Sequence, residues 1–221
     1  DYDPTDDSII LSVRNQSAVV KIGRDHQVKW ILASPEGWRS PWKDKVLKPV
    51  NASGQILKVE GSTCEGGFDW TWTQHTGWRI DSKSDEHVIY LSVFDNGDGR
   101  ALEQPPLPDM KYSRAVVYKI DQKKMTVEQI WEVGKELGHP YFSPVTGLTK
   151  YMEDTDTMMV YWSTAGLGAS PEKKGNKLGR LNPHICEYKW GETTPVVDIV
   201  LWDTFGYQAF PINLEKAFTL N

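Results

Sequence analysis

Short runs of apolar residues, separated by Gly, Pro and Asn, extend along most of the chain, and this pattern predicts β-strands. Three kinds of strand recur in the same order, and a fourth kind follows each group. The first kind covers 9–13, 88–93 and 158–163, the second 18–22, 115–120 and 184–189, the third 28–32, 127–133 and 197–202, and the fourth 68–76, 141–146 and 207–212. Helical periodicity is scarce, with 214–218 among the few candidates, so we predict an all-β fold.

Four strands per unit, repeated about three times, are typical of a β-propeller. Short turns rich in Gly, Asp and Thr join the second and third strands of each unit and favour hairpins. Long insertions interrupt the units at 34–64, 97–112 and 165–183. Long loops in a compact domain are often functional, so we expect them to form lids or mouths.

The predicted repeat does not close a ring. Three units are fewer than the roughly four to eight blades of most propellers, and the first unit lacks a leading strand in this interpretation. Open strand edges promote aggregation. We therefore expect further blades, supplied by a segment before Asp1 or by another chain, and a homodimer is one alternative.

One stretch, residues 66–78, stands apart because of its aromatic residues. In a strand, one face would carry Phe68, Trp70 and Trp72, and the other would carry Asp69, Thr71, Thr73 and His75. Strands of the fourth kind would line the central channel of a propeller, so His75 would face a polar cavity. The alternative is an ordinary strand with a solvated polar face.

Composition narrows the function classes. The chain has 221 residues, 39% of them hydrophobic, and a net charge of −5, which argues against a nucleic-acid partner because that usually requires a basic face. No apolar run approaches the roughly 20 residues of a membrane span. The chain opens without Met or a signal peptide, so we expect a processed product or a piece of a longer chain. Cys64 and Cys186 show no metal-type spacing with histidine, and we predict no metal or other cofactor.

The five histidines differ in their context. His75 is the one that the repeat brings to a channel, where a neutral imidazole with an ordinary pKa of about 6.5 can act as base or nucleophile. His139 precedes another strand of the fourth kind and could approach the same axis. His26 and His87 lie in charged turns, and His184 lies in a strand where a structural role is expected.

Two further motifs carry charge. Arg14 ends a strand and precedes Asn, Gln and Ser, so its guanidinium could bind sulfate or phosphate in a bidentate fork, or could simply be exposed on a hairpin. Residues 95–100, Asp-Asn-Gly-Asp-Gly-Arg, lack the full spacing of a calcium loop, so we predict a turn. The absence of a Gly-x-Ser-x-Gly elbow and of a phosphate-binding glycine loop argues against an α/β serine hydrolase and against nucleotide-driven transfer.

Three segments together resemble the bacterial arylsulfate sulfotransferases, which do not use the nucleotide sulfate donor. These segments are residues 6–17 (DDSIILSVRNQS), 64–76 (CEGGFDWTWTQHT) and 93–100 (VFDNGDGR), and the resemblance extends over essentially the whole chain. The family is a six-bladed propeller with an extra N-terminal β-domain. The resemblance therefore implies that residues 1–221 are the C-terminal part of the propeller, with three to four blades, and that the other parts are absent.

The resemblance implies ping-pong sulfuryl transfer from a phenolic sulfate ester to another phenol in the periplasm, without cofactor or metal. His75 matches the nucleophile that carries the sulfuryl group, and Arg14 matches the sulfate-binding arginine. Thr146 and Asn96 are expected to contact the substrate. A loose transition state, like that of phosphoryl transfer, would make positioning and cationic stabilisation dominant.

The resemblance also implies two departures. The family uses two more histidines and an asparagine, the latter in an Asp-Trp-x-His-x-Asn motif expected just upstream of Asp1, so we expect the chain alone to be inactive. The family also has a short-range disulfide near the nucleophile, with Cys64 as one partner, but Val59 stands where the other is expected. The alternative function is a non-catalytic propeller that binds aromatic or sulfated ligands.

Overall fold

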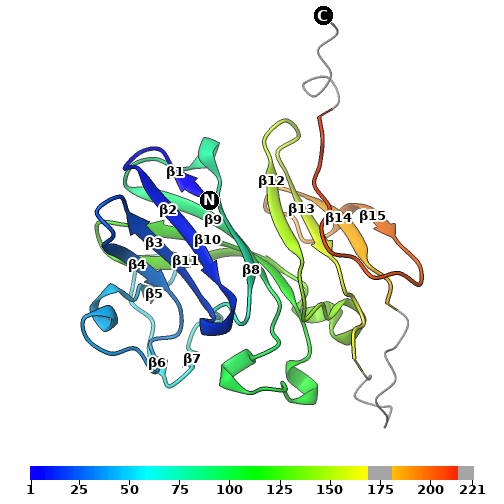
Figure 1. The fold of residues 1–221 in the computed structure, drawn as a ribbon, viewed down its shortest axis with the longest axis horizontal. Coiled ribbons are helices and arrows are strands. Elements are labelled where there is room, and N and C mark those ends of the chain that lie inside the picture. The colour runs from blue at the N-terminus through cyan, green and yellow to red at the C-terminus, as the bar shows by residue number, and fades with distance from the viewer. Residues whose placement is uncertain (169–180, 214–221) are drawn as a thin grey trace, which may run out of the picture.

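The fold of the chain is a succession of antiparallel sheets (Figure 1), as given by a computed structural model that describes residues 1–168 and 181–213. No α-helix occurs in these two ranges, and seven short 3-10 helices lie in the connections. The predicted all-β class is therefore confirmed. The helix candidate at 214–218 lies outside the described residues.

The first sheet is a four-stranded meander in the order β1-β2-β3-β4. Its strands are β1 (Tyr2–Asp3), β2 (Ser8–Val13), β3 (Ala18–Gly23) and β4 (Val28–Leu32). Glycine and charged residues make the turn between β3 and β4, where Gly23 N donates to Gln27 O at 2.9 Å. The leading strand that we expected to be missing is present, although β1 has only two residues.

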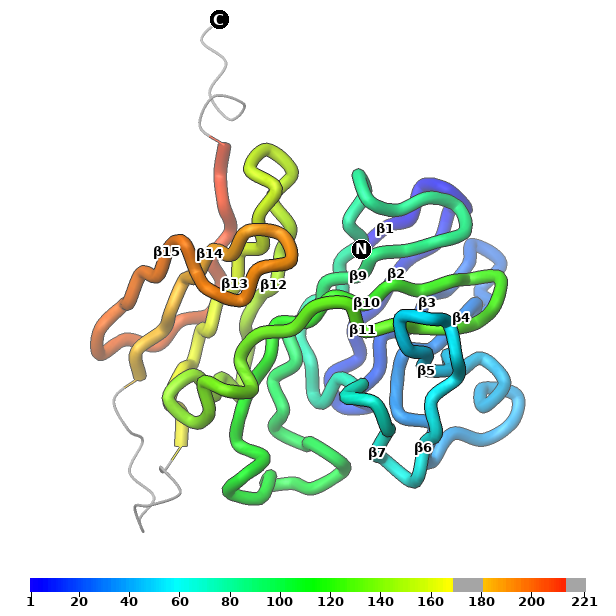
Figure 2. The backbone as a smooth tube through the Cα atoms, turned by 180° about the vertical axis from the view of Figure 1, so that it is seen from behind, coloured from blue at the N-terminus to red at the C-terminus, as the bar shows by residue number. Residues whose placement is uncertain are grey.

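The second sheet has five strands in the order β5-β11-β10-β9-β8. Its strands are β5 (Lys48–Val50), β8 (His75–Arg79), β9 (Val88–Asp95), β10 (Arg114–Asp121) and β11 (Thr126–Val133). The last four form an antiparallel meander, and β5 adds to the outer edge in parallel with β11. The segment between β4 and β8 therefore ties the first sheet to the second, as the tube in Figure 2 shows.

The third sheet repeats the four-stranded meander in the order β12-β13-β14-β15. Its strands are β12 (Leu148–Met152), β13 (Thr157–Trp162), β14 (His184–Lys189) and β15 (Pro195–Val200). A separate two-stranded hairpin, β6 (Val59–Glu60) and β7 (Thr63–Cys64), precedes the Trp-rich segment.

The core consists of apolar layers between successive sheets. One cluster joins the first and second sheets and contains Trp30, Trp70, Trp72, Leu91 and Tyr118, all almost fully buried. A second cluster joins the second and third sheets through residues of β10, β11, β13 and β14. β-Branched and aromatic residues fill these layers because they pack well on pleated surfaces. The repeated face-to-face stacking places β8 beside both β2 and β12.

The three strand kinds that we predicted first are confirmed to within a few residues, but the fourth kind is displaced. Residues 66–74 are not a strand, and β8 begins only at His75. Residues 139–141 form a 3-10 helix before β12, and no strand covers 207–212. The physical reason at the first site is backbone conformation, since Thr73, two residues before β8, has a φ of 50°, which a regular strand excludes.

The alternating polar residues of the Trp-rich segment are not a solvated face either. Thr71, Thr73 and Gln74 are buried, as are the aromatics Trp70 and Trp72. Gln74 Nε2 donates to the carbonyl oxygen of Ala18 at 2.8 Å, and Thr73 N donates to Ser17 Oγ at 2.9 Å. Residues 66–74 are thus an irregular, largely buried connection, in which Gln74 bonds to β3 of the first sheet and Thr73 bonds to the residue before β3.

Candidate functional site

His75 is the first residue of β8, where the buried connection of residues 66–74 joins the second sheet. The residues before and after His75 hold its backbone in place. Gln74 bonds to the first sheet, and Thr76 Oγ1 accepts a 3.3 Å hydrogen bond from Phe94 N. His75 itself pairs with Phe94 of β9, and a register shift follows before Trp78. The imidazole is half-buried and therefore held by backbone that has little freedom to move.

Asn96 decides the tautomer of His75. Its side-chain nitrogen donates to the carbonyl oxygens of Ser143 (2.7 Å) and Thr146 (2.5 Å), so its side-chain oxygen must be the atom 2.8 Å from His75 Nδ1. That oxygen can only accept a hydrogen bond, and Nδ1 must therefore carry the proton. The lone pair of the neutral ring is then on Nε2, which makes Nε2 the nucleophilic or basic atom.

The charge state of His75 follows from its surroundings. Burial lowers the pKa of the imidazole below its ordinary value of 6.5, and the positive charge of Arg14 lowers it further, whereas the hydrogen bond with Asn96 acts in the opposite direction. The balance keeps His75 neutral at pH 7. A neutral ring with a free Nε2 is the form that a nucleophilic histidine requires.

Arg14 is the first residue of the short 3-10 helix that follows β2, and it lies close enough to His75 to affect its charge state. Its Nη2 makes a 3.2 Å ion pair with Asp98 and a 3.4 Å hydrogen bond with the carbonyl oxygen of Pro144. About a third of its side chain (34%) is exposed, so it can still meet an anion from solvent. Asn15 accepts a hydrogen bond from Arg14, and Ser17 is already bonded to Thr73.

Thr146 reaches the site through its backbone. Its carbonyl oxygen accepts from Asn96, whereas its hydroxyl makes 2.6 Å hydrogen bonds with Ser163 Oγ and with the carbonyl oxygen of Val145. Thr146 has φ of 59° and precedes Gly147, where a Cβ would collide with the Phe94 ring. The four residues singled out in the sequence, His75, Arg14, Asn96 and Thr146, are thus brought together, with Thr146 shaping the backbone.

A buried ionic network supports the turn that carries Asn96. Asp95, fully buried, accepts from Arg100 and Arg114, each at 2.9 Å, and from the backbone nitrogen of Trp72 at 2.7 Å. Two arginines already occupy the Asp95 carboxylate. The turn predicted at residues 95–100 is found at residues 98 and 99, whereas Asp95 ends β9 and Arg100 begins a 3-10 helix. Sequence inspection missed this network, although charged residues at buried strand positions were a readable signal.

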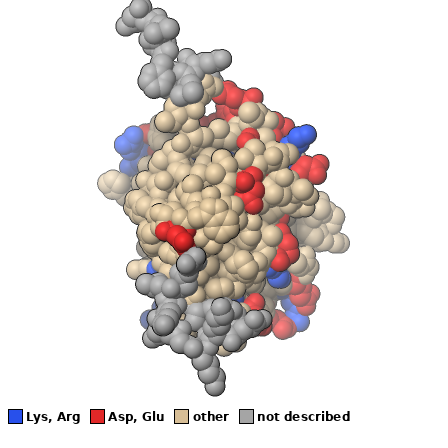
Figure 3. Space-filling model, turned by 90° about the vertical axis from the view of Figure 1, so that its right-hand side faces the viewer, with Lys and Arg blue, Asp and Glu red and all other residues tan. Residues whose placement is uncertain are grey.

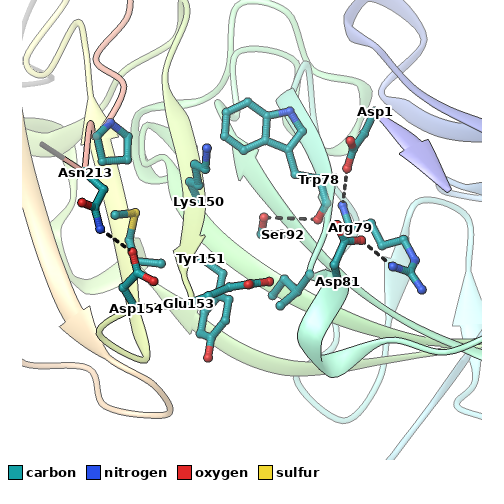
Figure 4. Close-up of a pocket in the computed structure, with 13 residues that line it drawn as sticks. Asp1, Trp78, Arg79, Asp81, Ser92, Lys150, Tyr151, Glu153, Asp154 and Asn213 are labelled. Carbon is teal, nitrogen blue, oxygen red and sulfur yellow. Dashed lines mark hydrogen bonds and ion pairs between the residues drawn. The ribbon is translucent and has the colours of Figure 1, made fainter. Parts of the chain in front are cut away.

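A cavity of about 450 Å³ lies toward the other end of β8, away from His75. Trp78, Arg79 and Ser92 line it on one side, and Lys150 faces them from β12 (Figure 4). Arg79 is paired there with Asp81 and Asp3. The cavity holds none of the four residues gathered at His75, so we do not assign it to the same site.

Two further histidines and both cysteines make their contacts outside this group of four residues. His87 lies near Glu86 and Lys123 on the surface, and His184 hydrogen-bonds to Asp198 in the third sheet. Both cysteines are free thiols. Val59 stands directly opposite Cys64 in the β6–β7 hairpin, so the residue that the resemblance placed as the missing disulfide partner is indeed its cross-strand neighbour.

Comparison with known proteins identifies relatives for nearly the whole chain. A family model described as Arylsulfotransferase (ASST) matches residues 1–208. The arylsulfate sulfotransferase AssT of Escherichia coli O6:H1 is 49% identical over 201 residues, which cover 90% of this chain and 32% of that protein. AssT of Lelliottia amnigena is 44% identical over 201 residues, with the same shares. The chain therefore spans about a third of the length of these curated relatives.

Proposed function

Since the chain belongs to the arylsulfotransferase family, we propose that it is part of an enzyme that transfers a sulfuryl group from a phenolic sulfate ester to another phenol. His75 is the nucleophile, Arg14 binds the sulfate oxygens and Asn96 holds the nucleophile in its reactive tautomer. The single observation that carries this proposal is the 2.8 Å contact of His75 Nδ1 with the immobilised side-chain oxygen of Asn96.

In the first half-reaction, Nε2 of neutral His75 attacks the sulfur of the donor. The Nε2–S bond forms, the ester S–O bond breaks, and the phenolate leaves and takes a proton from solvent. The ring becomes positively charged, with Nδ1–H still donating to Asn96, so a fixed carbonyl dipole faces the charge that develops. Arg14 offers a cation to the equatorial oxygens of a loose transition state.

In the second half-reaction, an acceptor phenol attacks the same sulfur and the Nε2–S bond breaks. The phenol gives up its proton to solvent or to a base, and His75 returns to its neutral form. Neutral imidazole is a good leaving group from the positively charged sulfohistidine, which favours this return. The mechanism is ping-pong because donor and acceptor occupy the site in turn.

We propose further that the three meander sheets are blades of a larger β-propeller. Their repeated topology and face-to-face stacking support this interpretation. The third sheet and the segment after it expose a group of apolar side chains, which we call the C-terminal apolar patch. Its members are Val196, Val197, Ile199, Leu201, Trp202, Phe205, Tyr207, Phe210 and Ile212. Few charged residues interrupt this side of the molecule (Figure 3), as expected for a face that another blade covers.

The catalytic proposal is tested in the protein at the full length of its relatives. We expect His75→Ala and His75→Asn to abolish transfer from 4-nitrophenyl sulfate to phenol, and His26→Ala to leave it unchanged. With donor alone, the unaltered protein should release one equivalent of nitrophenol in a burst and gain one sulfuryl group on the peptide that contains His75. Activity retained by both His75 variants would show that another group is the nucleophile, or that the chain is a non-catalytic binder.

We expect the 221-residue chain by itself to be inactive, because three sheets leave the proposed channel open and the relatives are about three times longer. The same assay tests this expectation, and measurable turnover would show that residues outside the chain are dispensable. Periplasmic location is proposed on the family resemblance, and cell fractionation checks it. No helix among the described residues is long and apolar enough to cross a membrane.

A further inference from the structure

Three potential metal ligands meet on the third sheet, far from His75 in the chain. His184 and Cys186 are two residues apart in β14 and so project from the same face, and Asp198 of β15 pairs directly with Cys186 across the sheet. His184 Nδ1 lies 2.8 Å from Asp198 Oδ1, and Cys186 Sγ lies 3.6 Å from the same oxygen. All three ligand atoms fall within 4.8 Å of one another.

From this geometry we propose that His184, Cys186 and Asp198 form a binding site for a zinc-type divalent cation. Nitrogen, sulfur and carboxylate ligands together suit Zn²⁺, which takes four ligands in a tetrahedron. Tetrahedral bonds of about 2.0–2.3 Å place ligand atoms roughly 3.5 Å apart, so modest side-chain rotations bring the three atoms into position. Water or another ligand takes the fourth place.

The surroundings of the site resemble those that hold metal ligands in place. The Tyr141 ring packs against the His184 ring at a tilt of 37°, with 4.3 Å between centroids, and its hydroxyl donates to the second oxygen of Asp198 at 3.2 Å. Trp162, which pairs with His184 across β13 and β14, is fully buried, and its indole N–H faces the Cys186 sulfur. An N–H donor that faces the sulfur stabilises the negative charge of a metal-bound thiolate.

The same geometry argues against a nucleophilic cysteine. In a Cys–His pair the imidazole must take the thiol proton, but Cys186 Sγ is bonded to Asp198 and no bond joins it to His184. Burial and, to a smaller extent, the Asp198 carboxylate together raise the pKa of the Cys186 thiol to about 12, so the thiol stays protonated at neutral pH. A divalent cation can displace this proton when it binds the sulfur. A thiol that stays protonated is a poor nucleophile toward a substrate carbonyl.

Cation binding moves protons at two of the three residues. The S–H bond of Cys186 breaks as the metal–sulfur bond forms, and its proton passes to solvent. His184 shifts its proton from Nδ1 to Nε2 and offers Nδ1 to the metal, while Asp198 gives a carboxylate oxygen. No electrons are transferred, and one proton is released for each cation that binds.

The experiment uses the 221-residue chain, kept reduced with a phosphine that does not bind metal strongly. Titration with Co²⁺ should give a sulfur-to-cobalt charge-transfer band that saturates at one equivalent, and Zn²⁺ should remove it with a Kd of about 1 μM or tighter. Cys186→Ser should abolish the band. Cys64→Ser, which removes the other free thiol, should leave it unchanged.

Two further variants keep the proposal falsifiable if Cys186→Ser does not fold. Asp198 is partly exposed, so Asp198→Asn should fold normally by circular dichroism and bind Zn²⁺ at least about tenfold more weakly. Tyr141→Phe should weaken binding by about tenfold through loss of the hydrogen bond to Asp198. Binding no tighter than about 1 mM, equal bands in the two cysteine variants, or unchanged affinity in folded Asp198→Asn would overturn the proposal.

Discussion

Asn96 is the residue on which the chemistry of the site depends, because it leaves His75 only one free ring nitrogen. Its own orientation is fixed by two backbone carbonyls, those of Ser143 and Thr146, so the constraint does not rely on solvent. In the proposed mechanism, the pair therefore combines a neutral imidazole with a fixed direction of attack. Predictions at the residue scale test each of these two properties in the protein at the full length of its relatives.

The first prediction concerns pH. Only neutral His75 is nucleophilic, and burial lowers its pKa below 6.5, so kcat/KM for the donor should fall with acid only through a midpoint below 6.5. Arg14→Gln removes a positive charge that lowers this pKa, and the midpoint should therefore move upward, whatever happens to the rate. A pH–rate profile of both proteins measures it, and a midpoint that stays fixed or moves to lower pH would contradict the assignment.

The second prediction concerns tautomer control. Asn96→Ala frees Nδ1 and allows the proton to move to Nε2, so the burst rate of nitrophenol release should fall by about 10- to 1,000-fold while His75 remains present. Stopped-flow absorbance measures the burst, and the histidine signals in heteronuclear NMR report the tautomer. Asn51→Ala, in a surface turn away from the site, is the matched control. A normal burst in Asn96→Ala would show that Asn96 has no positioning role.

At the scale of single elements, the β6–β7 hairpin allows a test of whether Cys64 lies directly opposite Val59. Val59 and Cys64 face each other between two hydrogen-bonded neighbours, with Glu65 N donating to Lys58 O at 3.0 Å. In such a non-hydrogen-bonded pair the Cα atoms are about 4.5 Å apart, a separation that a disulfide can span. The pair is therefore suited to a cross-strand disulfide once both residues are cysteine.

Val59→Cys should form a disulfide with Cys64 under mild oxidation and raise the free energy of unfolding by about 2 kcal/mol, as expected for a loop of roughly six residues. Thiol counts in denaturant and urea midpoints, each with and without reductant, give the result. Val59→Ser cannot form the bond and should show no dependence on reductant. Free thiols that persist in oxidised Val59→Cys would refute the geometry.

The buried network around Asp95 is the second element to test. Asp95→Ala leaves Arg100 and Arg114 buried without their shared partner and removes the acceptor of Trp72 N, so stability should fall by about 3–5 kcal/mol. Urea denaturation followed by tryptophan fluorescence measures the loss. Glu60→Ala breaks the exposed pair with Lys58 and should leave the midpoint unchanged within error. Equal midpoints for the two variants would contradict a supporting role for the network.

At the scale of the whole molecule, the C-terminal apolar patch predicts self-association of the 221-residue chain. Ile199 and Trp202, whose side chains are 50% and 74% exposed, lie at its centre. Ile199→Lys with Trp202→Glu should lower the association seen by sedimentation velocity and light scattering, because charged groups resist burial against a second copy. Trp42→Glu, in the loop between β4 and β5, should leave association unchanged. A monomeric unaltered chain at high concentration would argue against an uncovered blade face.

The sequence by itself determined the all-β class, the three repeated strand kinds and the identity of the four residues at the candidate site. These properties follow from local rules, because strand periodicity and turn residues act over a few positions, and the long matches around Arg14, His75 and Asn96 are specific. The strands of the fourth kind were misplaced because the left-handed backbone at Thr73 and Thr146 depends on contacts with residues distant in the chain, Ser17 and Ser163.

Only the tertiary structure decided how these residues act. The tautomer of His75 depends on Asn96, which follows β9, and on carbonyls contributed by residues 143–146. The His184–Cys186–Asp198 cluster depends on the register of β14 with β15, and the Asp95 network on side chains from three separate segments. Such contacts join groups that are far apart in the chain. The packing of the sheets decides which of these groups come within hydrogen-bonding distance. Alternation and spacing along the sequence do not show this, because they reflect only neighbouring positions.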